Sequence, residues 1–208
     1  MDELEYKLKH FSYRVRKKEC LDIPDKMYIQ RHVDLSAEQN KAYQELKVLA
    51  MAKIQDEKVS FNNKLTELLK LQQVTNGFVK TNDDKIVEFK TNPKLNELMN
   101  ILEETEDKCI IWANYVHNIE MIKTKLRETY GADSVVSIYG KDSVEVRNDA
   151  VETFQHNDRC RFLVGNPTVG GYGLTLTAAR HVIYFSNSYN LEVRWQSEDR
   201  AHRHGQTG

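Results

Sequence analysis

The stretch Arg161-Phe-Leu-Val164-Gly165-Asn-Pro-Thr168-Val-Gly170-Gly171-Tyr-Gly173 joins a short apolar run to a loop that is rich in glycine. An apolar run without polar alternation, bounded by turn residues, is typical of a strand that is buried on both faces. The glycines that follow can adopt positive φ and let backbone amides approach an anion closely. The loop matches neither G-x-x-x-x-G-K-[ST] nor G-x-G-x-x-G, so a plain tight turn is an equal interpretation.

The same rhythm of apolar runs and amphipathic segments continues on both sides of this stretch. Strands of this kind, separated by helices of about ten to fifteen residues, predict a parallel sheet with helices on both faces. Ligands gather at the carboxyl ends of the strands in such a sheet, which is where the glycine-rich loop falls. The expected strands cover 108–112, 135–139, 161–164 and 181–185, and the expected helices cover 93–102, 115–129, 144–156 and the residues after Asn190.

The first part of the chain follows a different pattern. A capping box at Ser36-Ala-Glu-Gln39 predicts the start of a helix, because Ser36 can cap the amide three residues on while Gln39 reaches back. The expected elements there are a linker over 1–26, a partly alternating strand over 27–35, helices after Ser36 and near 61–74, and a hairpin over 77–89. The chain is therefore divided into a linker (1–26), a helical and hairpin appendage (27–91) and an α/β domain (92–208).

Composition indicates an ordinary globular protein, with 40% hydrophobic and 29% charged residues and a net charge of −1. No apolar run approaches the roughly 20 residues of a membrane span. Cys20, Cys109 and Cys160 are odd in number and far apart, which argues against a disulfide framework and favours the reducing cytosol. The histidines are scattered, so no metal site is expected. The charge balance neither supports nor excludes nucleic acid as a partner.

The C-terminal stretch Gln196-Ser-Glu-Asp-Arg200-Ala-His-Arg203-His-Gly-Gln206 carries the strongest candidate site. A helix that ends at Gly205 places Gln196, Arg200 and Arg203 on one face, at i, i+4 and i+7. Two planar guanidinium groups and an amide on one stripe suit a phosphate better than lysines do. A solvated charged face is the ordinary explanation of such a pair, and it stays open from these residues alone.

Taken together, these segments resemble the C-terminal RecA-like lobe of the Swi/Snf-type translocases of helicase superfamily two. The C-terminal stretch resembles helicase motif VI in its Swi/Snf form, Q-x-x-x-R-x-H-R-x-G-Q. Residues 168–179 are similar to motif V, residues 108–114 to motif IV, and residues 68–76 to the stretch usually written LLRLRQICNHP. The sequence of residues 182–206 resembles that of the phage branch of the family.

The chain departs from the family pattern at three places. Thr175 stands where motif V commonly has Asn, and Ser186-Asn-Ser-Tyr-Asn190 replaces the usual Asp-x-x-Trp-Asn-Pro. Gly77-Phe78 replaces the His-Pro that normally follows Asn76. No functional role is therefore carried over to residues 186–190.

The resemblance implies an ATP-dependent motor of which this chain is one half. The chain contains no G-x-x-x-x-G-K-[ST], and the first lobe of the family supplies that motif and most of the Mg²⁺ ligands. ATP lies between the lobes, so Arg200 and Arg203 are expected to act as arginine fingers. Gln196 is expected to orient Arg200 or contact the nucleotide, and Gly171 and Gly173 are expected to bring the motif V backbone close to the cleft.

The resemblance also implies DNA as a partner, and double-stranded DNA in particular. Thr168 and Asn114 are the candidates for phosphate contacts, although a loop hydroxyl and a strand-end turn residue are the plain alternatives. The other partner is the first RecA-like lobe of the same polypeptide, with no membrane involved. The location is expected to be the cytoplasm, that of the host if the protein is encoded by a phage.

Two other functional classes stay open. One is a non-catalytic α/β module whose arginine helix binds phosphate or a partner protein without turnover. The other is a nucleotide-binding oxidoreductase, which is disfavoured because no glycine-rich turn follows the first strand with an acidic residue about 20 positions on. For the 208-residue fragment alone the expectation is negligible ATPase activity and weak, salt-sensitive DNA binding.

Overall fold

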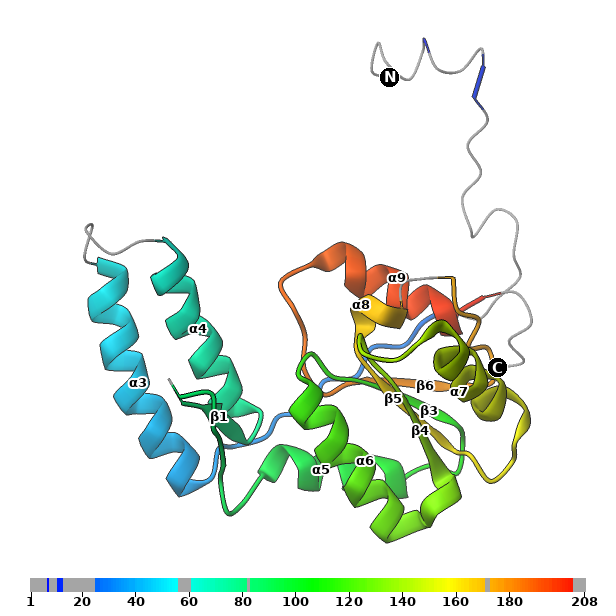
Figure 1. The fold of residues 1–208 in the computed structure, drawn as a ribbon, viewed down its shortest axis with the longest axis horizontal. Helices are drawn as coiled ribbons and strands as arrows, with labels where there is room; N and C mark the ends of the chain where they lie inside the picture. The colour runs from blue at the N-terminus through cyan, green and yellow to red at the C-terminus, as the bar shows by residue number, and fades with distance from the viewer. Residues whose placement is uncertain are drawn as a thin grey trace.

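The computed structural model describes residues 7, 11–12, 25–55, 61–81, 83–170 and 173–203. Figure 1 shows two parts: a pair of helices with a small hairpin on one side, and a sheet between layers of helices on the other. The extended segment 25–36 runs between α3 and the sheet-containing part.

The sheet is parallel throughout, as predicted. Its strand order is β4-β5-β3-β6, so β3 lies in the interior with β5 on one side and β6 on the other. Ile110 lies opposite Leu163 in β5 and opposite Val182 in β6. The strands are β3 (Cys109–Trp112), β4 (Val135–Ile138), β5 (Phe162–Gly165) and β6 (His181–Tyr184).

Two hydrophobic cores hold helices to the two faces of the sheet. Cys109 and Ile111 of β3 face the helices α5 and α6, whereas Ile110 and Trp112 face α7 and α9. All four side chains are fully buried, which explains why this strand is an unbroken apolar run. The helices are α5 (Pro93–Glu103), α6 (Val116–Tyr130), α7 (Val144–His156), the short α8 (Pro167–Gly170) and α9 (Leu191–Ala201), and a 3-10 turn covers Ala132–Ser134.

Three helices of this part begin at the residues that the sequence predicts. The side chains of Asn92, Ser143 and Asn190 each accept a hydrogen bond from the backbone N–H three residues later, at 3.2–3.3 Å. Each bond satisfies a donor that has no partner within the helix. These caps fix where the carboxyl-edge loops stop and the helices begin.

The appendage consists of a helical hairpin and a two-stranded antiparallel hairpin. The capping box is confirmed, because Ser36 Oγ accepts from Gln39 N at 3.2 Å and Gln39 Oε1 accepts from Ser36 N at 3.1 Å. Gln39 Nε2 also donates to Val74 O at 2.9 Å, which ties the two helices together. The elements are α3 (Ala37–Gln55), α4 (Phe61–Thr75), β1 (Phe78–Lys80) and β2 (Ile86–Glu88).

The strand expected over 27–35 is wrong. This segment has no regular structure, and a groove of about 670 Å³ separates residues 27–32 from β6. Side chains hold it instead: Lys26 binds Glu198 at one end, and Arg31 binds Glu97 and Glu104 further along. An alternating pattern becomes a strand only when a sheet edge lies within hydrogen-bonding distance, and the groove prevents that here.

Candidate functional site

The candidate DNA-contacting residues lie at the carboxyl ends of neighbouring strands. The backbone of Asn114, which follows β3, is fixed from two sides. Its N–H donates to Ser186 Oγ at 2.8 Å, and its carbonyl accepts from Asn166 Nδ2 at 3.0 Å. Asn166 Oδ1 in turn accepts from the N–H of Thr168 at 2.9 Å. Asn114 and Thr168 are therefore linked through Asn166, and Thr168 is exposed to solvent.

Sequence reasoning missed Asn166 and Ser186 and also treated residues 165–173 as a loop only. The segment contains the one-turn helix α8, and Asn166-Pro167 has the order of cap and first helical residue that begins many helices. The sequence therefore contained a signal for α8. It contained no signal for the bond that Ser186 accepts from Asn114, because these residues are 72 positions apart.

Arg200 lies in the last turn of α9 and is half-buried. Its carbonyl accepts a hydrogen bond from the N–H of Leu176 at 3.0 Å. Leu176 lies within residues 168–179, the segment that resembles motif V, so a backbone bond joins that segment to the arginine-bearing turn. This contact brings together the segments that resemble motif V and motif VI, which the sequence analysis identifies as candidate binding segments.

Arg203 does not continue the helical stripe, which corrects the prediction of a helix running to Gly205. The helix α9 ends at Ala201, and His202 is its C-terminal cap residue. The N–H of Arg203 donates to the carbonyl of Ala201 at 3.0 Å, whereas a continuing α-helix needs it to donate to the carbonyl of Asp199. The Arg203 guanidinium instead donates to Thr175 Oγ1 at 3.4 Å, on the motif V side.

The remaining nucleotide candidates are placed in part. Gln196 is exposed, and its Nε2 donates to Glu192 Oε1 at 2.9 Å, one turn earlier on α9. Gly173 has a φ of +71°, a conformation that favours glycine. Gly171 lies outside the described residues, as do His204–Gly208.

The other side of α9 carries a buried ion-pair cluster around Glu198. Arg194 Nε donates to its carboxylate at 2.7 Å, Tyr28 OH at 2.9 Å and Lys26 Nζ at 3.1 Å. Burial raises the pKa of Glu198, but these three donors outweigh it and hold the pKa below its ordinary value. The Arg194 guanidinium also lies 3.4 Å from the ring centroid of Tyr184. These contacts fix how α9 lies along β6.

Trp195 does not pack α9 onto the sheet, because 60% of it is exposed. Small residues make that contact: Ala201 is buried in the core, and Ser197 Oγ lies 2.6 Å from the hydroxyl of Tyr184. Small side chains allow a helix to approach a sheet closely, which leaves the bulky Trp195 outside.

Lys94, at the start of α5, carries a half-buried amine at the carboxyl edge of the sheet, next to Phe185 after β6. Its Nζ donates to Asn76 Oδ1 at 2.8 Å and lies 5.1 Å from the ring centroid of Phe185. Burial lowers the pKa of Lys94 to about 8. The unfolded amine keeps its proton up to about pH 10.5, so between these values the unfolded chain binds more protons and stability rises with pH.

We expect this linkage to appear when the chain is compared with its Lys94→Met variant. From pH 7.5 to 10, the free energy of unfolding of the parent should gain about 2 kcal/mol relative to the variant. Urea denaturation of both proteins at several pH values measures this difference. A difference that does not change with pH would contradict the lowered pKa.

These observations define a class of protein. A parallel sheet covered on both faces, with a glycine-rich segment that begins at its carboxyl edge and is bonded to an arginine-bearing helix, is the arrangement of the second RecA-like lobe of a superfamily-two motor. The sequence profile of the helicase conserved C-terminal domain matches residues 93–205. The chain belongs to this family, and it is a C-terminal RecA-like lobe of the Swi/Snf type.

Curated relatives and solved structures agree with that assignment. The chain is 30% identical over 198 residues to an uncharacterized ATP-dependent helicase of Mycoplasma genitalium, covering 93% of this chain and 19% of the relative. It is 29% identical over 196 residues to another from Mycoplasma pneumoniae, covering 93% and 18%. The chain therefore spans about a fifth of the length of these relatives.

Among solved structures, the SWI2/SNF2 ATPase core of Sulfolobus solfataricus in complex with double-stranded DNA is 28% identical to this chain. The TM-score is 0.73, with 99% of this chain and 44% of that chain covered. The C-terminal part of the Fun30 ATPase domain has the same fold, with a TM-score of 0.68 at 17% identity, over 89% and 83% of the two chains.

Proposed function

We propose that this chain is the second motor lobe of an ATP-dependent DNA helicase or translocase. Arg200 and Arg203 are its arginine fingers, which reach ATP held on a first lobe of the same polypeptide. The observation that carries this proposal is the backbone bond from Leu176 to Arg200, because it joins the segment that resembles motif V to the turn that carries the arginine. The family membership supports it.

The chemistry assigned to the arginines is stabilisation of charge. In phosphoryl transfer, negative charge spreads over the oxygens of the γ-phosphate, and a guanidinium fork placed there lowers the barrier. Gly173, and Gly171 beyond the described residues, would let the backbone approach the cleft. Gln196, now bonded to Glu192, would turn to the nucleotide or to Arg200 once the cleft closes.

Mg²⁺ would accompany ATP and would be held mainly by the first lobe. Among the residues that the structure describes, no group of three or more His, Cys, Asp or Glu side chains is arranged to hold a metal ion. The contribution that we propose for this lobe is positive charge from arginine.

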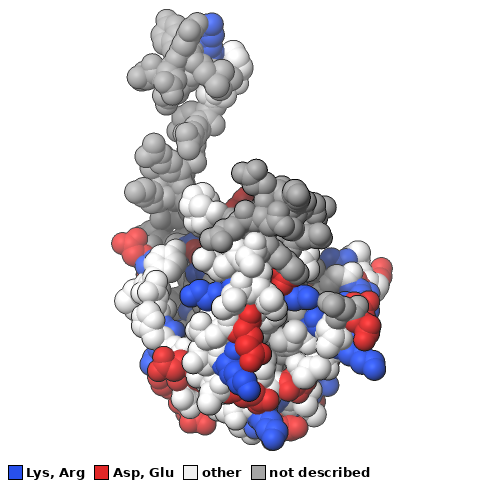
Figure 2. Space-filling view, turned by 90° about the vertical axis from the view of Figure 1, so that its left-hand side faces the viewer, with Lys and Arg blue, Asp and Glu red and all other residues white. Residues whose placement is uncertain are grey.

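DNA would be bound through its backbone by Thr168 and Asn114, without base recognition. The related Sulfolobus solfataricus core was solved with double-stranded DNA, which supports duplex as the substrate of this protein. Figure 2 shows Lys and Arg interspersed with Asp and Glu on the face seen from the side of the appendage, without a broad basic surface.

The proposed division of the chain is a linker over 1–26, an appendage over 27–91 and the motor lobe over 92–208. We place the protein in the cytoplasm. In the described part of the chain, no helix is both long and apolar enough to span a bilayer.

The test is steady-state ATP hydrolysis by the full-length protein with double-stranded, single-stranded or no DNA. We expect duplex DNA to stimulate hydrolysis and the 208-residue lobe alone to show negligible turnover, because the lobe lacks a phosphate-binding loop with lysine. Full-length protein without DNA-stimulated ATPase would favour the non-catalytic module instead. Robust turnover by the lobe alone would contradict the division of labour between two lobes.

A further inference from the structure

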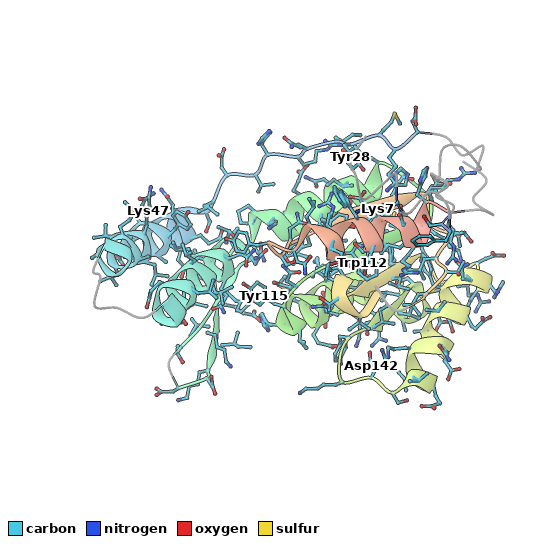
Figure 3. The ribbon with its side chains drawn as sticks, turned by 90° about the horizontal axis from the view of Figure 1, so that it is seen from above. Lys7, Tyr28, Lys47, Trp112, Tyr115 and Asp142 are labelled. Carbon is cyan, nitrogen blue, oxygen red and sulfur yellow. The ribbon has the colours of Figure 1, made fainter. Side chains whose placement is uncertain are left out.

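The appendage meets the sheet-containing part through a polar junction at the carboxyl edge. Figure 3 shows Tyr115 between α4 and the sheet-containing part. Gln72, near the end of α4, and Asn76, just after it, make five hydrogen bonds across this junction, and His117 Nε2 of α6 also lies 3.0 Å from Glu88 Oε1 of β2. The partners of Gln72 and Asn76 in the sheet-containing part are Asn92, Lys94, Tyr115, Asn118 and Asn187.

Asn76 anchors the junction and is 1% exposed. Its carbonyl accepts from Asn118 Nδ2 at 2.9 Å and from Asn92 Nδ2 at 3.3 Å. Its side-chain oxygen accepts from Lys94, and its Nδ2 donates to the carbonyl of Gln72 at 2.8 Å. A buried residue with so many satisfied groups fixes the geometry of its surroundings.

Close packing next to Asn76 makes the junction rigid. Gly77 has a φ of +92°, and a Cβ at this position would lie 2.0 Å from Asn92 Nδ2. The buried ring of Phe78 meets Tyr115 edge-on, with ring centroids 5.3 Å apart. The end of α4 is therefore held at a fixed position against the loop that follows β3.

Gln72 uses both ends of its amide to join two loops of the motor. Its Oε1 accepts from the hydroxyl of Tyr115 at 2.8 Å, and its Nε2 donates to the carbonyl of Asn187 at 2.7 Å. Burial raises the pKa of Tyr115, so its hydroxyl stays protonated and able to donate.

The two loops that Gln72 joins have different tasks in the proposed motor. Tyr115 directly follows Asn114, a candidate DNA contact. Asn187 lies between Ser186 and α9, the helix that presents Arg200. The amide of Gln72 thus links the two loops on the appendage side, in addition to the direct bond from Asn114 N to Ser186 Oγ.

We propose that Gln72 is a positioning residue that couples the DNA-side loop after β3 to the nucleotide-side helix α9, with Tyr115 as its partner. This inference rests on the proposed function. The appendage then supplies a bridge within the motor, and the bridge sets how strongly bound DNA accelerates ATP hydrolysis. Gln72 touches neither ligand.

The experiment uses the full-length protein with the variants Gln72→Leu, Gln72→Glu and Tyr115→Phe. Tyr115→Phe removes one hydroxyl and keeps the ring against Phe78. Gln72→Glu keeps the acceptor for Tyr115 but loses the donor to Asn187. For each variant we measure ATPase without DNA, ATPase at saturating duplex, KM for ATP and thermal midpoint. Gln44→Leu, an exposed glutamine of the same appendage, is the matched control.

We expect ATPase without DNA and KM for ATP to stay within about twofold, while DNA stimulation falls about five- to tenfold, in the range of ordinary coupling between sites. The double variant Gln72→Leu/Tyr115→Phe should lose no more stimulation than Gln72→Leu alone, because both changes break the same bond. Gln44→Leu should behave as the parent.

Unchanged DNA stimulation in folded Gln72→Leu and Tyr115→Phe would overturn the inference. So would a parallel loss of both activities together with the thermal midpoint, which indicates a merely structural role. Arg200→Ala separates this outcome from failure of the proposed function: if that variant loses ATPase while the Gln72 variants keep full stimulation, only the bridge is wrong.

Discussion

Replacing Arg200 by alanine lowers the kcat for DNA-stimulated ATP hydrolysis of the full-length protein by about 10³-fold or more, if the arginine-finger role holds. The physical reason is the loss of a guanidinium fork at the oxygens where charge develops. Folding should be spared, because the contact that Arg200 makes to Leu176 uses its backbone carbonyl and survives the change. Steady-state ATPase at saturating ATP and duplex DNA measures the effect.

Two further variants make this result specific. Arg200→Lys keeps the charge but loses the planar fork, so most of the loss should persist. Arg159→Ala, an exposed arginine in the turn before β5, is the matched control and should keep parental kcat. A kcat for Arg200→Ala within tenfold of the parent would exclude the finger role.

The second large effect is on stability and concerns Gly165, the last residue of β5. A Cβ at Gly165 would lie 2.6 Å from Ile138 Cγ1, 2.8 Å from the Ile138 carbonyl and 3.1 Å from Trp112 Cζ3. Two of these atoms belong to fully buried side chains and one to backbone, so none can yield easily. We expect Gly165→Ala to lower the free energy of unfolding by about 3 kcal/mol.

Urea denaturation of the lobe measures this loss. Gly140→Ala is the control, because a Cβ there would have no heavy atom within 4 Å, and it should change stability by less than about 0.5 kcal/mol. A loss for Gly165→Ala no larger than that of Gly140→Ala would mean that the close packing at the end of β5 is not limiting.

The sheet and most helix starts were predictable from sequence because their signals are local. The run Cys109–Trp112 is apolar throughout since both of its faces are covered, and Asn92, Ser143 and Asn190 cap helices through bonds spanning three residues. The capping box at Ser36 worked for the same reason. At each of these positions the apolar pattern and the capping side chain predict the same strand or helix start.

The predictions that were wrong depend on contacts between residues far apart in the sequence. Residues 27–35 alternate as a strand does, but whether they pair depends on a distant edge that lies across a groove. At the end of α9 the N–H of Arg203 bonds to the Ala201 carbonyl, and the Arg200 carbonyl accepts from Leu176, which is 24 positions earlier in the chain.

The candidate site was predictable only as a list of residue types. Sequence placed Asn114, Thr168 and Arg200 at strand and helix ends, and the structure connects the first two through Asn166. The bridge at Gln72 had no signal in the sequence, because its two partners lie 43 and 115 positions away. Such contacts depend on the packing of the whole lobe.

The backbone bond between Leu176 and Arg200 has a thermodynamic corollary for the intact motor. In the proposed motor, Leu176 joins the segment that carries Thr168 to the turn that carries Arg200, so we expect binding of duplex and binding of nucleotide to be coupled. By the closure of the binding cycle, the factor by which duplex tightens nucleotide binding equals the factor by which nucleotide tightens duplex binding. We therefore expect duplex DNA to dissociate most readily from the nucleotide state that the DNA-bound enzyme binds least tightly.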